Sequence, residues 1–347
     1  MVDYPKVKVC AAHVAPVFLD TEKTVAKAVS LIAEAARAGA RLIAFPESFV
    51  PGFPVWTSVQ APIKNHEHFK RFAAQSIEVP GAEVQQLCDA AREHSIFVSI
   101  GVNERSPASV GCLWNSNLMI GADGTLLTHH RKLVPTFYEK LVWANGDGEG
   151  LAVRDTEIGK LGMLICGENT NPLARYALIA QGEQIHVSSY PPIWPTRPPN
   201  EAGRYDLAAA IRIRAGAHSF EGKVFNIVSS ACLDKTVFDA LRSLDQEARE
   251  TLELSPRGVS MVLGPSGEVI SDTLCETEGL LYQDIDIEQC VEPKQFHDVV
   301  GYYNRFDVFD LKVTRTRLKP ITIDDAATAP AATISNGRST TSEPGGL

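Results

Sequence analysis

Short apolar runs alternate with helix-length amphipathic segments along most of the chain, and this alternation constrains the fold more than any other feature. Residues 6–14 and 41–45 are rich in Val, Ala and Ile and have the length of strands. Between them, Asp20 can cap a helix whose apolar residues recur at helical spacing until Gly39. The order strand, helix, strand predicts a mixed α/β layer fold.

The same alternation continues to about residue 320. Further helices are predicted over 84–93, 173–180, 202–219 and 239–252. Further strands are predicted over 96–102, 113–120, 125–130, 161–165, 185–189 and 224–229. The turns GADG and GPSGE each indicate a hairpin.

No Gly/Ser-rich or Pro-rich linker interrupts this pattern, so we expect a single domain over residues 1–323. Residues 324–347 contain no aromatic side chain and are rich in Ala, Thr, Ser, Pro and Gly. Such a segment cannot bury enough apolar surface to fold, and we expect a disordered tail.

Composition excludes several partners and compartments. The chain has 42 Asp and Glu against 33 Lys and Arg, with no basic block, which argues against nucleic acid as a partner. Its apolar runs are too short for a membrane span, and no secretory signal is readable. Seven dispersed cysteines without a CxxC pair fit a reducing cytoplasm and give no zinc site. His66 and His68 lack a third ligand at a recognisable spacing, so we expect no metal.

Three segments place a reactive side chain directly after a predicted buried strand. LIAFPES ends near Glu47, LLTHHRKLVPT carries Lys132 and LGMLICGENTNP carries Cys166. Functional loops gather at strand ends in α/β sheets. A helix predicted to begin near Asn171 would lower the pKa of the Cys166 thiol and favour the thiolate.

Each of these residues also has a structural interpretation when it is taken alone. Glu47 could cap a turn or form a surface ion pair, and Lys132 could be solvated beside Arg131. Cys166 could be inert core packing, as most buried cysteines are.

The segments FPESFVPGFP, HRKLVPT and CGENTNP, in this order, resemble the three motifs of the nitrilase branch of the carbon-nitrogen hydrolase superfamily. The resemblance extends through YEKLVWANGDG, ALIAQGEQIHVSSYPP and GYYNRFDVF, from residue 6 to about 318. It implies an αββα four-layer sandwich whose protomers pair across their helical faces and stack further into spirals. It also implies Cys166 as nucleophile, Glu47 as general base, Lys132 as stabiliser of the charged intermediate and Glu139 as a supporting carboxylate.

The residue after CG assigns the branch. The segment CGEN, with Glu168, resembles the sequence that follows the cysteine in nitrilases and their cyanide-hydrolysing relatives. Amidases and carbamoylases commonly continue with an aspartate-containing segment at this point. Tyr302 stands where many microbial nitrilases have histidine, so no role is assigned to that position.

The resemblance implies hydrolysis of a nitrile to the acid and ammonia through a thioimidate and a thioester on Cys166. These steps need no cofactor. Cyanide or amide hydrolysis is the alternative within the superfamily, and a catalytically silent scaffold is the alternative from another class.

Two sets of apolar residues could each have either of two roles. Trp56, Tyr190 and Trp194 could wall an apolar substrate pocket or belong to the core. The apolar residues of 239–252 could cover the core or contact another subunit. They are Leu241, Leu244, Ala248 and Leu252.

Overall fold

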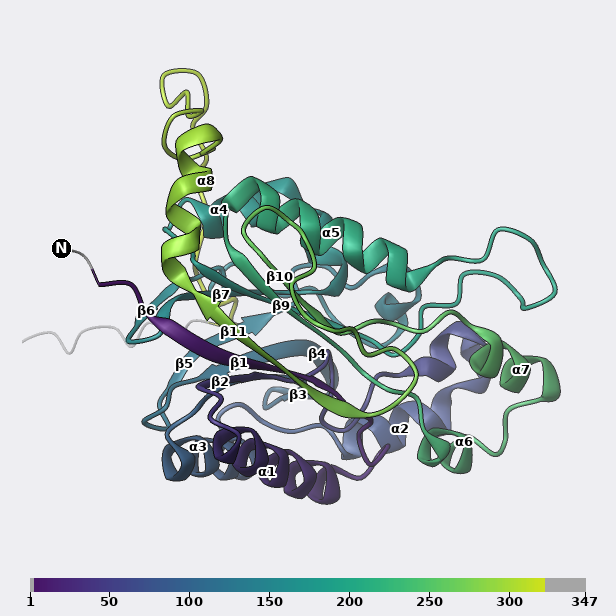
Figure 1. The fold of residues 1–347 in the computed structure, drawn as a ribbon. Helices are drawn as coiled ribbons and strands as arrows, with labels where there is room; N and C mark the ends of the chain where they lie inside the picture. The colour runs from purple at the N-terminus through teal and green to yellow at the C-terminus, as the bar shows by residue number, and fades with distance from the viewer. Residues whose placement is uncertain (1–2, 322–347) are drawn as a thin grey trace, which may run out of the picture. The chain divides into compact units, whose positions relative to one another are not determined.

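Two β-sheets lie face to face at the centre of the computed structural model, which describes residues 3–321 (Figure 1). The first sheet has the strand order β11-β1-β2-β3-β4-β5 and the second has the order β10-β9-β8-β7-β6. The strands are β1 (Lys6–His13), β2 (Leu42–Ala44), β3 (Phe97–Ser106), β4 (Ser109–Ile120), β5 (Leu126–Arg131), β6 (Arg154–Thr156), β7 (Gly159–Ile165), β8 (Ile185–Tyr190), β9 (Phe225–Ser230), β10 (Met261–Leu263) and β11 (Gly279–Asp286).

Strand direction determines where the loops that follow the strands meet. Strands β1, β2 and β3 are parallel, and β4 and β5 then alternate in direction. Strand β5 therefore runs in the same direction as β2, and both end at the same edge of the first sheet. In the second sheet β7, β8 and β9 are parallel, with β6 and β10 antiparallel at its edges.

Alternation along the strands creates the layers. In β1, Val9 and Ala11 face the second sheet, where they join a cluster that includes Met163 and Val187. The intervening Cys10 belongs to the cluster under α1 and α3. One face of the first sheet thus meets the other sheet and its opposite face meets helices, as the period of two requires.

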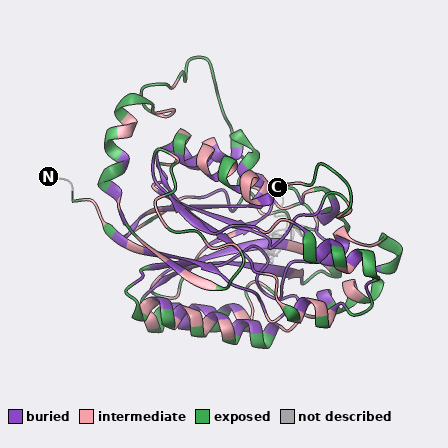
Figure 2. Cartoon of the chain, turned by 45° about the vertical axis from the view of Figure 1, so that its right-hand side comes forward, coloured by how far each residue is buried: buried purple, intermediate pink, exposed green. Residues whose placement is uncertain are grey.

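Helices cover the outer face of each sheet. Helices α1 and α3 cover the first sheet, α4 and α5 cover the second, and their outer faces are exposed (Figures 1 and 2). The helices are α1 (Thr21–Arg37), α2 (His66–Ala74), α3 (Ala82–His94), α4 (Pro172–Ile179), α5 (Leu207–Gly222), α6 (Lys235–Ala240), α7 (Gln246–Leu254) and α8 (Val291–Phe296). The predicted αββα sandwich is confirmed.

Capping residues explain where several helices begin. Asp20 accepts a hydrogen bond from the Lys23 backbone N–H at 3.0 Å and begins α1 as predicted. The predicted helix over 202–219 starts later, at Leu207, because Asp206 caps it while residues 201–205 remain irregular.

The predicted single helix over 239–252 is wrong. The segment holds the end of α6 and most of α7, and Asp245 begins α7 by accepting from the Ala248 N–H at 3.0 Å. The apolar period continues across this break because both short helices face the same core. A capping aspartate inside the pattern was the signal that marks a second helix.

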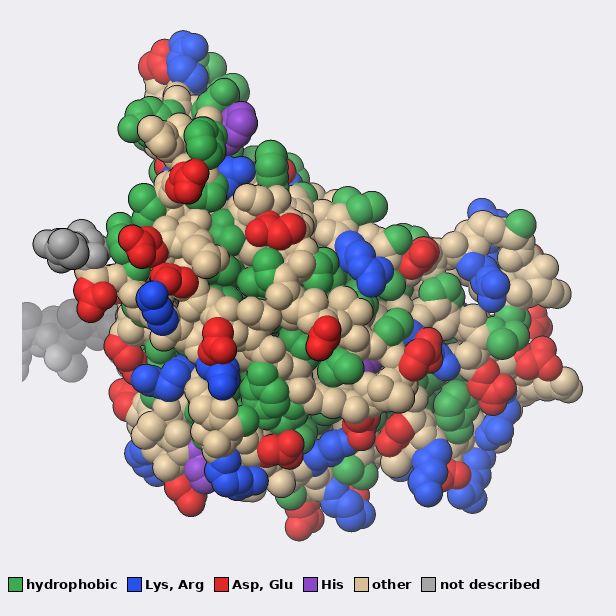
Figure 3. All heavy atoms as spheres, in the orientation of Figure 1, with side chains coloured by type: hydrophobic (Ala, Val, Ile, Leu, Met, Phe, Trp, Pro, Cys, Tyr) green, Lys and Arg blue, Asp and Glu red, His purple; other side chains and the backbone are tan. Residues whose placement is uncertain are grey.

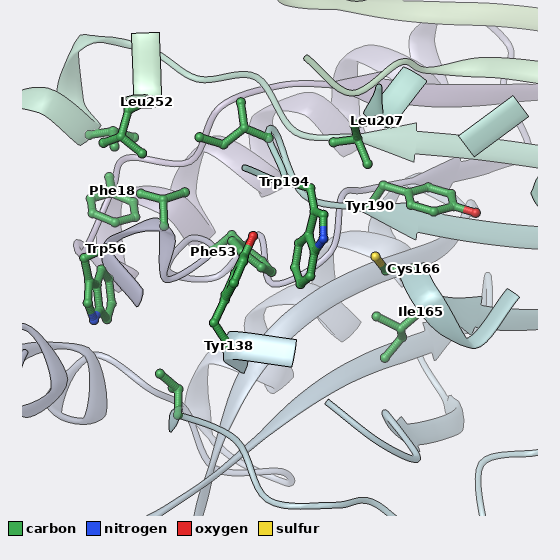
Figure 4. Packing of buried hydrophobic residues seen from close by; sticks show 14 of the residues in the cluster. Phe18, Phe53, Trp56, Tyr138, Ile165, Cys166, Tyr190, Trp194, Leu207 and Leu252 are labelled. Atoms are coloured by element: carbon green, nitrogen blue, oxygen red, sulfur yellow. The ribbon is translucent and has the colours of Figure 1, made fainter. Parts of the chain in front are cut away.

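The four apolar residues of this segment are buried within the chain, and Leu252 is among the packed side chains in Figure 4. Their alternative role as a subunit contact is therefore wrong, and they cover the core. We expect Leu244→Glu to destabilise the fold, because it would bury a carboxylate in this core.

The described residues up to Arg317 form one compact unit. The predicted boundary at residue 323 and the predicted tail over 324–347 lie outside the described residues. Among residues 3–321, no helix has the length and apolar character needed to cross a bilayer. Acidic and basic side chains are interspersed on the face shown in Figure 3.

Candidate active site

Three of the four predicted catalytic residues follow the ends of strands, and the fourth lies in a short helix. Glu47 follows β2, Lys132 follows β5 and Cys166 follows β7, while Glu139 lies in the short 3-10 helix η3 (Phe137–Leu141). All four are buried, and Cys166, at 4% exposure, is the most accessible of them.

The structure brings these four side chains together, and we call them the Lys132 cluster. Lys132 Nζ donates to Glu47 Oε1 at 2.7 Å and to the two Glu139 oxygens at 2.9 and 2.7 Å. A carboxylate oxygen from each glutamate and the Cys166 Sγ all lie within 4.8 Å of one another. These atoms could ligate a metal ion, but here the Lys132 ammonium supplies the positive charge between the carboxylates.

The two carboxylates are held differently. Glu139 Oε2 accepts from the Thr136 backbone N–H at 2.7 Å, so both of its oxygens have partners. Glu47 Oε1 accepts from Lys132 and from Asn115 Nδ2 at 2.7 Å, whereas Glu47 Oε2 has no partner among the described residues. Glu47 therefore keeps one carboxylate oxygen that is free to accept a proton.

Asn115 was missing from the sequence prediction. It lies on β4 and is buried. A buried amide within a strand is a signal for a polar partner, but its spacing does not identify Glu47 as that partner.

Glu168 connects the segments that carry Lys132 and Cys166. Its Oε1 accepts from the Leu133 backbone N–H at 2.6 Å, and its Oε2 accepts from the Ile165 N–H at 2.9 Å. His130 Nε2 lies 2.9 Å from the same Oε2. The sequence identified Glu168 as a branch marker but gave no positional role for it.

The backbone of Cys166 is in the left-handed region, with φ of 49°. For a residue with a side chain this conformation is costly and persists only where the surroundings impose it. It begins the 3-10 helix η4 (Cys166–Thr170).

Electrostatics in the Lys132 cluster follow from two carboxylates sharing one ammonium. Burial raises the pKa of Glu139 to about 7, with Lys132 opposing the rise and Glu47 adding to it. Burial alone would lower the pKa of Lys132, but the two carboxylates outweigh it and raise that pKa. Lys132 therefore remains cationic.

The expectation of a thiolate at Cys166 is wrong for the resting site. Burial raises the pKa of the thiol, Glu47 raises it further, and Lys132 opposes them without prevailing. Helix α4 begins only at Pro172, and the Asn171 side chain caps its first backbone N–H groups. The resting side chain is therefore a thiol.

The predicted aromatic residues fall in two places. In the cluster of buried apolar residues drawn in Figure 4, Trp194 and Tyr190 lie toward Cys166, and Trp56 lies at the opposite end. Trp194 stacks on Tyr138 with ring centroids 4.3 Å apart. Trp56 packs edge-on against Phe72 at 5.1 Å and lines a separate cavity of about 260 Å³.

Comparison with known proteins identifies the family. The family model of the carbon-nitrogen hydrolases matches residues 8–295. An aliphatic nitrilase from Rhodococcus rhodochrous is 36% identical over 325 residues, covering 92% of this chain and 86% of the relative. A protein named nitrilase 3, from an unknown prokaryotic organism, is 35% identical over 320 residues, covering 89% and 91% of the two chains.

The fold is shared with solved structures of the superfamily. A Saccharomyces cerevisiae member of branch 10 of the nitrilase superfamily superposes with a TM-score of 0.66 at 18% identity. The match covers 87% of this chain and 97% of that structure. The predicted family and enzyme class are confirmed. The chain belongs to the carbon-nitrogen hydrolase family, which is also called the nitrilase superfamily.

Proposed function

We propose that this protein hydrolyses organic nitriles to the carboxylic acid and ammonia, with Cys166 as nucleophile and Glu47 as general base and acid. The observation that carries the proposal is the Lys132 cluster, in which a thiol, two carboxylates and an ammonium share one buried site. Full-length relatives named as nitrilases support the choice of nitrile over amide.

The first step joins the Cys166 sulfur to the nitrile carbon. Glu47 takes the thiol proton as the S–C bond forms, and that proton is passed to the nitrile nitrogen, which gives a thioimidate. The raised pKa of the thiol makes this coupling necessary, because little thiolate is present beforehand.

The remaining steps use Glu47 twice more. Glu47 passes one proton of a water to the imidate nitrogen as that water adds to the thioimidate. It then passes the proton of the new hydroxyl to the same nitrogen as the C=O bond forms and the C–N bond breaks, which releases ammonia. A second water, activated in the same way, adds to the resulting thioester, and breaking the C–S bond releases the acid and restores the thiol. A cavity of about 10 Å³ beside Glu47 has room for about one water.

Lys132 and Glu139 support these steps electrostatically. The fixed ammonium of Lys132 stabilises negative charge that develops on nitrogen or oxygen in the transition states. Losing one such preorganised contact typically lowers the rate by about 10²- to 10³-fold. Glu139 accepts hydrogen bonds from Lys132 and so holds that ammonium in place.

The substrate side is apolar. Trp194, stacked on Tyr138, and Tyr190 would wall the R group, and water and the nitrile are the only small molecules required. Trp56 would influence the pocket from the more distant end of the same aromatic cluster. No cofactor or metal enters the proposed steps.

The protein assembles as a dimer through α4 and α5, with stacking into larger spirals as a further stage. Leu173 on α4 and Ile213 and Phe220 on α5 are exposed large apolar side chains. Such a surface favours burial against a second copy. Light scattering of the wild type and Ile213→Glu tests the dimer, since the variant should be monomeric.

All seven cysteines are unpaired thiols, which fits the cytoplasm.

A substrate panel tests the reaction itself. The purified protein is incubated with aliphatic and arylaliphatic nitriles, the matching amides and cyanide, and acid and ammonia are quantified. We expect equimolar acid and ammonia from at least one nitrile. Turnover of amides alone or of cyanide alone would replace the proposal with that reaction, and no turnover on any of them would leave a silent scaffold.

A further inference from the structure

A second buried charged group lies behind the nucleophile, and we call it the Glu183 cluster. It consists of Glu183 from the loop before β8, His186 on β8 and His218 on α5, all fully buried. Glu183 Oε1 lies 2.7 Å from His186 Nδ1, and Glu183 Oε2 lies 2.6 Å from His218 Nε2. The two imidazole rings stack at 3.7 Å.

These distances describe hydrogen bonds rather than a metal centre. Nitrogen and oxygen ligands of one tetrahedral zinc ion stand about 3.3 Å apart, as metal–ligand bonds near 2.0 Å require. The contacts at 2.6 and 2.7 Å are shorter and match charge-assisted hydrogen bonds. Hydrogen bonds, rather than a metal ion, therefore hold the three side chains of this cluster together.

Asn169 connects this cluster to the nucleophile. Its Nδ2 donates to the Cys166 carbonyl at 3.1 Å and to the Leu164 carbonyl at 3.3 Å. Because both of these partners are acceptors, the orientation of the amide is determined. Its Oδ1 must then face His186 Nε2 at 3.0 Å, with the Ser188 hydroxyl donating to it at 3.1 Å.

This orientation determines the protons on His186. An amide oxygen only accepts, so His186 Nε2 must carry a proton. The contact between His186 Nδ1 and Glu183 needs a second proton, which rests either on the imidazole or on the carboxyl. His186 is thus an imidazolium beside a carboxylate, or an imidazole beside a carboxylic acid.

The surroundings favour the ion pair. Burial alone would raise the pKa of Glu183, but His186 and His218 outweigh it and lower that pKa to about 2. Burial, then the charge of His186, lower the pKa of His218 to about 4, so His218 is a neutral donor to Glu183. The other nearby cation, Arg175, is paired with Glu221 at 2.9 Å.

The second sheet leaves space for this cluster. A Cβ at Gly162 on β7 would collide with the Glu183 carboxylate, so only glycine admits the side chain at this point. Arg175 donates to the Asn169 backbone carbonyl at 2.8 Å and holds the same turn from α4.

We propose that Glu183, an imidazolium at His186 and Asn169 form a buried positioning chain that holds the Cys166 turn in its left-handed conformation for attack. The chain ends on the carbonyl of Cys166 itself, whose backbone φ of 49° must be imposed by its surroundings. The proposed catalytic effect rests on the proposed function, because the chain acts through Cys166. None of its members touches the substrate.

A matched pair of variants tests the chain at His186. Gln places its amide nitrogen near the Nε2 position and keeps the donor to Asn169, whereas Asn reaches only the Nδ1 position and loses it. Since a misplaced reacting group can cost about 10²-fold in rate, we expect kcat to fall about 100-fold in His186→Asn and Asn169→Leu. In His186→Gln it should fall less than about 10-fold, with KM within about threefold throughout.

His218→Gln is the control for general damage, because His218 contacts Glu183 and not Asn169. It should lower thermal stability about as much as His186→Asn while retaining most of kcat. Equal losses of kcat in His186→Asn, His186→Gln and His218→Gln would overturn the positioning role.

Hydrogen exchange of the peptide covering residues 164–170 provides a readout that does not depend on activity. Exchange should accelerate in His186→Asn and Asn169→Leu, and match the wild type in His186→Gln and His218→Gln. Unchanged exchange in all four variants would overturn the chain. If the wild type hydrolyses no nitrile, the proposed function fails, but this measurement still decides the chain.

Neutron diffraction of the deuterated protein tests the proton assignment. We expect deuterium on both ring nitrogens of His186, on Nε2 alone of His218, and none on Glu183. A deuterated Glu183 beside a singly deuterated His186, or a metal ion between the three side chains, would overturn the assignment.

Discussion

The Lys132 cluster and the Glu183 cluster are both buried groups of charges that we propose act on Cys166. They differ in whether every carboxylate oxygen has a hydrogen-bond partner. The first meets the Cys166 side chain and the second, through Asn169, its backbone. In the first, Glu47 Oε2 has no partner among the described residues, and two carboxylates share one ammonium. In the second, each carboxylate oxygen of Glu183 has a histidine partner.

This difference separates a reactive site from a support. A group that must accept and return a proton needs an atom without a partner, and among the described residues of the Lys132 cluster that atom is Glu47 Oε2. In the second cluster both carboxylate oxygens of Glu183 are paired, which fixes geometry, since each buried partner is costly to displace. Substitutions in the first cluster should therefore reduce turnover directly. Those in the second should reduce stability, and should lower turnover only where they break the link from His186 to Asn169.

The largest expected effect is at Cys166, the proposed nucleophile. Cys166→Ala should lower turnover by at least about 10⁴-fold, because no other group can form the covalent intermediate. The fold should persist, because a small side chain replaces another. Cys10→Ala, also a buried cysteine, should remain active. Ammonia release and circular dichroism of both variants provide the measurement, and normal turnover by Cys166→Ala would refute the mechanism.

Glu47→Gln comes next. It keeps the shape of the side chain but cannot exchange a proton, and we expect kcat to fall by about 10²- to 10⁴-fold. Glu104→Gln is the matched control, because Glu104 is a buried carboxylate paired with His129 and Arg131 outside the site. It should cost stability and leave kcat within about tenfold. Similar rate losses in both variants would show that Glu47 has no special role.

Glu139→Gln should have a smaller effect on rate, about 10²-fold, because it disturbs Lys132 rather than a proton transfer. It also tests the raised pKa. A carboxyl with a folded-state pKa of about 7 binds protons that the unfolded chain has released above about pH 4.5. Wild-type stability should therefore fall, relative to the variant, as pH rises from about 4.5 to 7. A constant difference in melting temperature across this range would contradict that shift.

Glu183→Gln should have the smallest effect on rate, less than about tenfold, because the amide oxygen can still accept from a histidine. Its pH dependence should have the opposite sign. The folded-state pKa of Glu183 is about 2, below the ordinary value of 4.5, so its stabilisation is present above about pH 4.5. It should be lost as pH falls toward 2. Melting curves of the wild type, Glu139→Gln and Glu183→Gln over pH 2–8 would show the two opposite pH dependences of stability. If stability depends on pH in the same way at both residues, the two clusters do not differ as proposed.

The sequence was sufficient for what is local or follows a motif. Alternation predicted a mixed α/β layer fold. The resemblance to the nitrilase motifs implied the αββα sandwich and a common site for Glu47, Lys132 and Cys166. It could not separate α6 from α7, because both short helices continue one apolar period.

Properties that depend on partners distant in the chain remained out of reach. The resting pKa of Cys166 depends on burial and on Glu47, which follows a strand of the other sheet. The Glu183 cluster joins a loop, a strand and a helix through His186 and His218. The polar residues in the buried run QIHVSS indicate that partners must exist, but not which residues they are.

Peptide-mapping mass spectrometry of the rapidly quenched wild-type enzyme during nitrile turnover tests the central claim most directly. The account predicts adducts only on the peptide that contains Cys166, with the mass of the intact nitrile for the thioimidate or of its acyl group for the thioester. Both adducts should decay as acid and ammonia appear. Steady turnover with no adduct on Cys166, or with an adduct on another residue, would contradict the account.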